Sequence, residues 1–564
     1  MATAIGASTA IRQLFQIRNR YGAALAAQKL CLLQQLAGGK FKSAAELRRW
    51  HSALCFLHAF PDSLQHYRLA RTELANMEYR VAQLPRAERL KLRDTGIAGT
   101  SVHCQFSFEV ASWLQRRVPA IVSIDWGKDH DPPGLDEILT HLLQPADEEY
   151  FDSGLVTGKD WIGNACRNSD ATDFDWLLAQ LQEHRLRSTW AALYNAAELW
   201  LKWDLRSTRF SKSSNRVAAA KVCVRPQGLR KPAGSVAAEI RRPLESLTRL
   251  PPRAGSRMID VAMASLAVRH RETNHFNHAN PREVYVADVG EGVSIAIFGL
   301  LQEHRYPLEC TMGYLLLSNG MPIGYGGASM LFLQANTGVN IFDEYRGSEA
   351  AFLWVQVMRV FHQLAGCTRF IANSYQFGAD NSEALRSAAF WFYYRLGYRP
   401  VRREIRELAS SSAGTRDDVK LLRRLASCDM HLSLPGARHN ELFEERWLET
   451  SSLLATEMLN ATGSRNRRDA AHRVANRLAQ DIGVRSLAQW SRAERHAFER
   501  IAPLVAIADP GNWPAAEKRS LCALLRAKGG ECEANFARQL AQHSSLLAAL
   551  RRACRNAERR ERRA

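Results

Sequence analysis

The residues best suited to chemistry lie where a short apolar segment, 338–345, runs through Arg346 and Gly347 into a helical stretch that reaches about Leu364. The first N–H groups of a helix have no intrahelical partner, and the helix dipole favours negative charge at that end. A strand, a tight corner and a helix N-terminus in succession therefore predict an anion site that would suit a pyrophosphate.

A second group of residues whose types could take part in a reaction lies at the end of a predicted helix over 381–395. Tyr393 stands four residues before Gly397, in a turn formed by Leu396, Gly397 and Tyr398. This tyrosine fits a structural aromatic cluster with the three residues before it.

These residues fall within one succession of predicted helices and strands. Apolar runs broken by turn residues predict two hairpins, and Asn319-Gly320 supplies the positive φ angles of the second turn. The predicted order is a helix over 258–279, hairpins over 283–301 and 313–328, a strand over 338–345, a helix to 364, a strand over 368–375, a helix over 381–395 and a last strand from 396. Such an order predicts an α/β (α+β) domain with a mixed sheet.

In this order and in two local motifs, residues 258–405 resemble the GNAT superfamily of acyl-CoA-dependent N-acyltransferases. The family's phosphate loop reads Arg or Gln, two residues, Gly, one residue, then Gly or Ala. Here Arg346 and Ala351 fill the outer places, but Glu349 replaces the middle glycine. A carboxylate aimed at the pyrophosphate would repel it, which predicts a shifted loop or weaker cofactor binding. Tyr393 matches the family tyrosine that protonates the leaving thiolate.

The resemblance implies an enzyme that transfers an acetyl or other acyl group from acyl-CoA to an unidentified amine, with no metal. Backbone N–H groups around residues 340–342 would hold the thioester oxygen and the pantetheine amides. The implied cofactor-binding residues are Asn340, Ile341, Phe342, Arg346, Gly347, Ser348, Ala350 and Ala351. The implied general acid is Tyr393.

A base must take the proton of the substrate ammonium. The candidates are Glu344 at the end of the strand, Glu309 before the second hairpin, and His275 and His278 on the predicted first helix. Each of them also fits an ordinary surface or satisfied polar position.

The chain has 564 residues, which is too long for one core and predicts several units. We predict a helical N-terminal region over 1–92, a mixed α/β region over 93–205, a basic linker with prolines over 206–257, a GNAT-like domain over 258–412 and a helical, Arg-rich region over 413–564. The linker carries 13 Lys and Arg against two acids.

The basic surplus of the whole chain, 76 Lys and Arg against 57 Asp and Glu, gives a formal charge of +19. Such a charge attracts phosphates of a cofactor or of a nucleic acid, and it also fits a merely solvated surface. Two alternatives to the enzyme therefore stay open. One is a catalytically degenerate scaffold or acyl-CoA sensor, which Glu349 favours, and the other is a polyanion-binding protein.

The cysteines indicate a reducing compartment. There are 11, an odd number with no CxxC pair, so neither a zinc site nor a disulfide framework follows from their spacing. The apolar runs are shorter than the roughly 20 residues that cross a bilayer. The sequence predicts a cytoplasmic protein without a membrane span, and it leaves the oligomeric state open.

Overall fold

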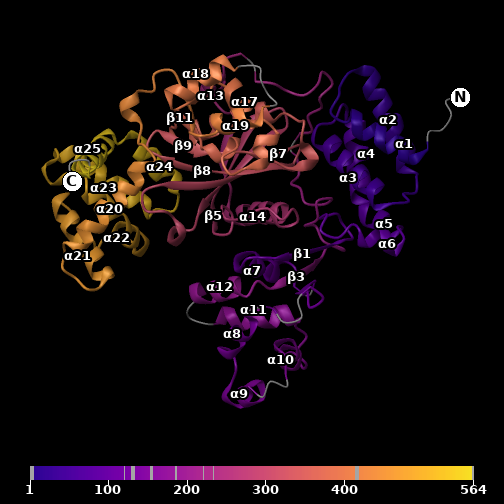
Figure 1. Cartoon of the computed structure of the whole chain (residues 1–564), viewed down its shortest axis with the longest axis horizontal. Helices are drawn as coiled ribbons and strands as arrows, with labels where there is room; N and C mark the ends of the chain where they lie inside the picture. The colour runs from indigo at the N-terminus through magenta and orange to yellow at the C-terminus, as the bar shows by residue number, and fades with distance from the viewer. Residues whose placement is uncertain are drawn as a thin grey trace.

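The computed structural model describes residues 6–119, 121–128, 132, 134–152, 156–183, 187–219, 221–232, 234–412 and 418–561. Across these residues the protein is a mixed α/β molecule, in which helices flank a large central sheet (Figure 1). Within the same residues, no helix is both long and apolar enough to cross a membrane.

The N-terminal unit is helical, as its sequence predicts. Its helices are α1 (Ala7–Ile17), α2 (Ala23–Ala37), α3 (Ala44–Ala59), α4 (Leu64–Ala75), α5 (Met77–Ala82) and α6 (Arg86–Leu90). α3 is mostly buried and docks on the central sheet. The carbonyl of Ala59 accepts hydrogen bonds from Ser318 Oγ at 2.7 Å and from Asn319 Nδ2 at 3.0 Å, both in the turn of a central hairpin.

The 93–205 unit has a small antiparallel sheet of its own, in the order β1-β3-β2. Its elements are β1 (Ser101–Gln105), α7 (Phe108–Arg117), β2 (Val122–Ile124), α8 (Leu135–Thr140), α9 (Pro145–Asp152), α10 (Gly158–Ala165), α11 (Asp173–Glu183), α12 (Arg187–Ala196) and β3 (Trp200–Asp204). Figure 1 shows this unit as a projection on the α14 side of the central sheet.

The central sheet runs in the order β12-β13-β11-β9-β8-β7-β6-β5-β4, and β10 pairs with β8. Its strands are β4 (Ser246–Arg249), β5 (Ala279–Gly290), β6 (Val293–Leu300), β7 (Cys310–Ser318), β8 (Met321–Leu331), β9 (Gln334–Thr337), β10 (Asn340–Ile341), β11 (Arg369–Ala372), β12 (Arg399–Pro400) and β13 (Met430–Ser433). β9 and β11 are parallel, and the other described pairs are antiparallel.

Both predicted hairpins are confirmed, as β5–β6 and β7–β8. At the second turn Asn319 and Gly320 have φ values of +47° and +78°, the left-handed backbone that their types favour. The predicted strand over 338–345 is largely wrong. β10 covers only its middle, and a 3-10 turn, η2 (Asp343–Tyr345), follows because the N–H of Tyr345 bonds to the carbonyl of Phe342.

Helices cover both faces of the central sheet (Figure 1). α14 (Pro252–Ala267) packs along β5 on one face, while α13 (Val236–Arg241) packs against α15 (Ala350–Ala365) on the other side. The remaining helices around the sheet are α16 (Ser382–Arg386), α17 (Ala389–Arg395), α18 (Arg403–Ser411) and α19 (Val419–Leu425). α14 ends twelve residues before the predicted end at 279, so His275 and His278 lie in the turn that follows it.

Two predicted boundaries need correction. The segment 206–257 is not a free linker, because it contributes β4 to the central sheet, and Asn215 in it is buried and bonds to the Val261 carbonyl at 2.9 Å. The domain also continues past residue 412, since β13 lies between β11 and β12. Both strands join the sheet through pairings with residues that are distant in sequence.

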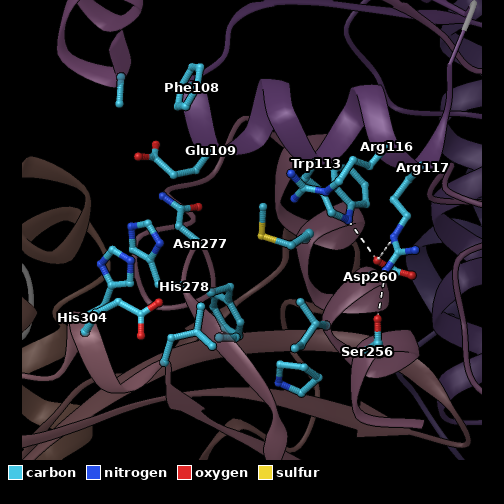
Figure 2. Close-up of a pocket in the computed structure, with 18 residues that line it drawn as sticks. Phe108, Glu109, Trp113, Arg116, Arg117, Ser256, Asp260, Asn277, His278 and His304 are labelled. Atoms are coloured by element: carbon cyan, nitrogen blue, oxygen red, sulfur yellow. Dashed lines mark hydrogen bonds and ion pairs between the residues drawn. The ribbon is translucent and has the colours of Figure 1, made fainter. Parts of the chain in front are cut away.

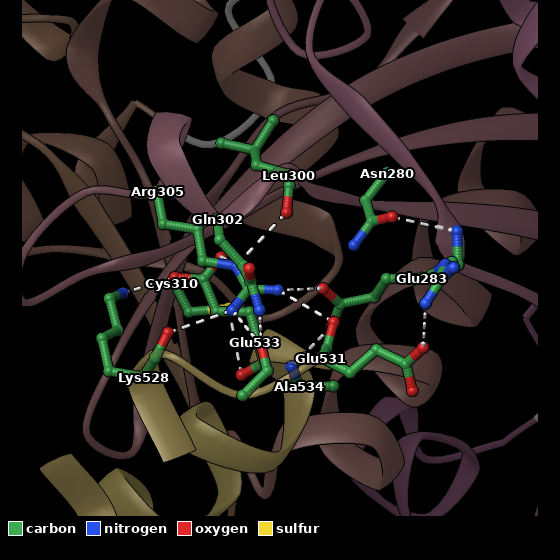
Figure 3. A network of polar contacts seen from close by, with 12 residues as sticks. Asn280, Glu283, Leu300, Gln302, Arg305, Cys310, Lys528, Glu531, Glu533 and Ala534 are labelled. Carbon is green, nitrogen blue, oxygen red and sulfur yellow. Dashed lines mark hydrogen bonds and ion pairs between the residues drawn. The ribbon is translucent and has the colours of Figure 1, made fainter. Parts of the chain in front are cut away.

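The C-terminal region is helical, as predicted, with α20 (Arg446–Asn460), α21 (Arg467–Asp481), α22 (Arg492–Ala506), α23 (Ala515–Lys528), α24 (Glu533–Gln542) and α25 (Ser544–Glu561). A buried polar network fixes it to the sheet (Figure 3). Arg305 lies 3.1 Å from Glu283 and 3.7 Å from Glu533, and it donates to the carbonyls of Lys528 and Glu531 at 3.0 Å. The arginine therefore joins the β6–β7 connection to the start of α24.

Candidate functional site

The central sheet opens at the point where β9 gives way to β10. β9 pairs with both β8 and β11, and its last pairing with β11 joins Asn336 to Ile371. β10 pairs with β8, through Asn340 and Ile341. Because β11 is followed by the turn η3 (Ser374–Phe377), the far edge of β10 faces a gap in the sheet.

Glycines on β8 and in the connection between β9 and β10 permit this opening. A Cβ at Gly326 would collide with the hydroxyl of Tyr314 and with the carbonyl of Gly338. The Tyr314 hydroxyl donates a hydrogen bond to that carbonyl, which satisfies it outside the β8–β9 ladder. The segment between β9 and β10 therefore separates from β8 at Gly338 without leaving this carbonyl unpaired.

Two further glycines make room for polar side chains. A Cβ at Gly327 would overlap the imidazole of His275, and one at Gly338 would overlap the amide of Gln376. His275 and Gln376 therefore lie against the backbone of β8 and of the β9–β10 connection, on the edge of the opening.

Adjoining pockets of about 390 Å³ and 350 Å³ fill the opening, and together we call them the cleft. Both are lined by Arg271, Tyr325, Asn340, Gln376, Asn381 and Glu383. The larger pocket adds Glu272, His275, Gly326, Gly327, Ser329, Asn336, Thr337, Gly338, Asn373 and Tyr375. The smaller adds Val339, Ile341, Phe342, Arg346, Ala350, Ala384, Ser387, Ala389, Phe392 and Tyr393.

The backbone of β10 presents a donor to the cleft. The N–H of Phe342 bonds to the carbonyl of Ile323 on β8 at 3.0 Å, so it faces away from the opening. Successive N–H groups along a strand point to opposite sides, which directs the N–H of Ile341 toward the gap. Of the predicted backbone contacts at 340–342, the one from Ile341 is therefore the one that can reach a ligand.

The predicted phosphate corner adjoins the cleft. Arg346 and Ala350 line the smaller pocket, whereas Gly347, Ser348 and Ala351 line neither pocket. Gly347 has a φ of +79°, and a Cβ on it would lie 2.8 Å from the amide nitrogen of Asn19 in the N-terminal unit. The N-terminal unit thus covers the outside of the corner, while the inside faces the cleft.

Arg346 spans the mouth of the smaller pocket. Its guanidinium is paired with Asp343 at 2.9 Å and with Glu383 on α16, the opposite wall. All three side chains are more than half exposed, so these pairs are weak and a diphosphate can replace them.

Glu349 does not face the anion site, which corrects the prediction made from the loop pattern. The side chain is fully buried, and its Oε1 accepts hydrogen bonds from Arg225 Nε at 2.7 Å and from the N–H of Arg230 at 2.9 Å. The carboxylate that replaces the family's glycine is therefore neutralised within the protein. It does not repel an anion in the cleft.

Tyr393 lies at the wall of the smaller pocket. Its ring packs edge-on against Trp354, Phe377, Phe392 and Tyr398, with centroids 5.3 to 6.0 Å apart. Burial raises the pKa of Tyr393, so the phenol keeps its proton at neutral pH. Both predicted roles, cluster member and proton donor, are compatible with this position.

Neither predicted carboxylate base lines the cleft. The side chain of Glu344 is buried. It forms ion pairs with Lys212 at 3.0 Å and with Arg269 at 3.4 Å. Burial alone would raise the pKa of Glu344, but the two cations outweigh it and hold that pKa well below its ordinary range. Glu309 lies beside Lys528 of α23, and burial raises its pKa.

His275 is the predicted base candidate that does line the cleft. Burial lowers the pKa of its imidazole, which keeps a nitrogen lone pair at neutral pH. Its neighbour Glu272 accepts a hydrogen bond from the Tyr325 hydroxyl at 2.7 Å. His278 belongs to a different cavity.

Comparison with protein-family models, with curated proteins and with solved structures found no match for this chain. What the cleft does is therefore inferred from its own residues.

Sequence patterns missed several residues that line both pockets, namely Arg271, Tyr325, Gln376 and Glu383. A signal was present for one of them, because Tyr325 stands directly before the paired glycines of β8. Asn381 was predicted as a helix cap, and its side chain does accept the N–H of Ala384 at 3.0 Å. It also lines the cleft, which the capping pattern alone does not indicate.

Proposed function

We propose that this protein is an acyl-CoA-dependent N-acyltransferase of the GNAT type, which transfers an acetyl or other acyl group to an amine. The observation that carries the proposal is the continuity of the cleft with the N-terminus of α15, through Arg346 and Ala350. An extended acyl-pantetheine arm suits the opened edge of β10. The diphosphate then meets the first N–H groups of the helix, which favour an anion.

The reaction is a direct transfer. The amine nitrogen bonds to the thioester carbonyl carbon, the carbon–sulfur bond breaks, and the sulfur leaves as a thiolate. In this proposal the N–H of Ile341 donates a hydrogen bond to the developing oxyanion. Tyr393 donates its proton to the thiolate, because a buried phenol stays protonated until that step.

The proton of the attacking amine goes to His275 in this proposal. We assign the role of base to His275 and not to Glu344 or Glu309, because neither carboxylate lines the cleft. A neutral imidazole accepts a proton, while a carboxylate held between two cations is a poor base. The carboxylate of Glu272 lies beside His275 and attracts the ammonium group of the substrate before the ammonium loses its proton.

One observation favours a second candidate, an acyl-CoA sensor without catalysis. Arg346 is already paired across the mouth of the cleft with Glu383, so a bound cofactor would exchange one partner of Arg346 for another and release α16. Such a sensor binds acyl-CoA but does not consume it.

Turnover separates the two candidates. The full chain is incubated with acetyl-CoA and a panel of primary amines, and both the free thiol of coenzyme A and the mass of each amine are followed. The enzyme proposal expects thiol release matched by a gain of one acetyl group. Tyr393→Phe should lower the rate, while Tyr394→Phe, on the neighbouring residue outside the cleft lining, should not. Binding without release on any amine would support the sensor instead.

A further inference from the structure

A separate cavity of about 760 Å³ lies between the 93–205 unit and the central domain (Figure 2). It shares no lining residue with the cleft. α7 forms one wall, and α14 with the turn after it forms the other. Its size and its place between two units are typical of small-molecule sites.

Much of the cavity wall is apolar. The apolar lining residues are Phe108 and Trp113 on α7, Ile259 and Met263 on α14, and Phe276 in the turn that follows α14. Aromatic and thioether groups in this arrangement favour a flat apolar body, because the ring faces and the sulfur both attract it.

At one end of the cavity an aspartate and an arginine of the lining neutralise each other. Asp260 accepts hydrogen bonds from Trp113 Nε1 at 3.0 Å and from Arg117 Nε at 2.7 Å, and Arg117 also donates to Ser256 Oγ at 2.8 Å (Figure 2). This cluster fixes α7 to α14 and holds the indole of Trp113 in place. Asp260 therefore serves the wall and is not available to a ligand.

The other end carries a carboxylate without a partner. The side chain of Glu109 is half-buried in the cavity lining, and no hydrogen bond or ion pair joins it to another described residue. Asn277 lies beside it (Figure 2). A carboxylate without a cation next to it at a partly buried surface favours a ligand that carries positive charge and donates hydrogen bonds.

We propose that this cavity binds a small aromatic primary amine. The ammonium lies against Glu109, and the ring lies between Trp113 and Met263. This site is distinct from the proposed acyl-transfer cleft, and its occupation does not depend on acyl-CoA.

Calorimetric titration of the full chain tests the proposal with phenethylamine as the probe. Phenylacetate reverses the charge on the same ring, and 2-phenylethanol removes it. We expect phenethylamine to bind one per chain and phenylacetate not to bind. Glu109→Gln should weaken phenethylamine binding by about tenfold or more, the scale of one lost charge-assisted bond.

Two control variants locate the bound amine. Glu148→Gln changes an exposed acid on α9 of the same unit and should leave the affinity unchanged. Ala191→Phe fills the cavity from α12 and should abolish binding while the melting temperature stays near that of the wild type. Absence of phenethylamine binding, equal affinity in Glu109→Gln, or loss of binding in Glu272→Gln of the cleft would each overturn the proposal.

Discussion

Glu349 Oε1 lies 2.7 Å from Arg225 Nε, in an ion pair between two buried side chains that are 124 residues apart in sequence. This pair anchors the start of α15 to the 221–230 segment. It also takes up the negative charge that would otherwise disfavour an anion at the helix N-terminus.

Removal of the arginine should destabilise the protein strongly. In Arg225→Met the Glu349 carboxylate stays buried without its partner, which costs about 3 to 5 kcal/mol of unfolding free energy. Urea denaturation of the two proteins measures the difference. The double variant Arg225→Met with Glu349→Gln should recover most of the loss, because no buried charge remains. Equal stability of Arg225→Met and wild type would show that the pair is not closed in solution.

The proposed base predicts a pH dependence of turnover. Burial lowers the pKa of His275 below its ordinary 6.5, so the imidazole is neutral at pH 7 and becomes protonated only at lower pH. The rate should fall as the pH drops through that lowered pKa. His275→Asn should lose most of the activity together with this acid limb, and His472→Asn, on exposed α21, should retain both. An unchanged limb in His275→Asn would assign the base elsewhere.

The glycines of β8 should respond differently to the same substitution. In Gly326→Ala the new methyl meets a backbone carbonyl and the Tyr314 hydroxyl, so the unfolding free energy should fall by about 1 to 3 kcal/mol. In Gly327→Ala the three atoms nearest to the new methyl all belong to the movable ring of His275. That variant should stay closer to wild-type stability and lose turnover. Thermal denaturation and rate measurements on both variants separate the two effects, and the reverse ranking of stability would contradict the geometry.

Glu344 should stabilise the fold above its ordinary pKa. Burial opposes ionisation, but Arg269 and Lys212 hold the pKa of Glu344 below the usual 4.5. A depressed folded-state pKa gives stability that is present above pH 4.5 and lost as the pH falls through the lowered value. Glu344→Gln should therefore be less stable than wild type at pH 7, and the gap should narrow below pH 4. A gap that is constant in urea titrations at both pH values would exclude this role.

The local parts of the fold were predictable from the sequence because their signals are local. Asn319 and Gly320 specify the turn of the β7–β8 hairpin through their own backbone preferences. β9, Gln334–Thr337, was missed since it is short and mostly polar, and β4 and β13 were missed because each pairs with a strand that is distant in sequence.

The candidate site was predictable only where backbone chemistry defines it. The helix N-terminus after Arg346 could be read from residue order, but the state of the acids beside it could not. Glu344 and Glu349 are neutralised by Lys212 and Arg225, which come from the segment expected to be a free linker. The placement of His275 over a glycine likewise depends on a turn that packs across the sheet.

The most direct test of the acyl-CoA site is calorimetric titration of acetyl-CoA into the full chain and its variants. Wild type should bind one acetyl-CoA per chain. Arg346→Ala should bind about tenfold more weakly, on the scale of one lost phosphate contact. Glu383→Gln, which removes one of the two acids paired with Arg346, should bind more tightly. Arg386→Ala, an exposed arginine on the same α16 as Glu383, should match wild type. If acetyl-CoA does not bind, or binds equally to wild type and Arg346→Ala, the cleft is not the cofactor site that we propose.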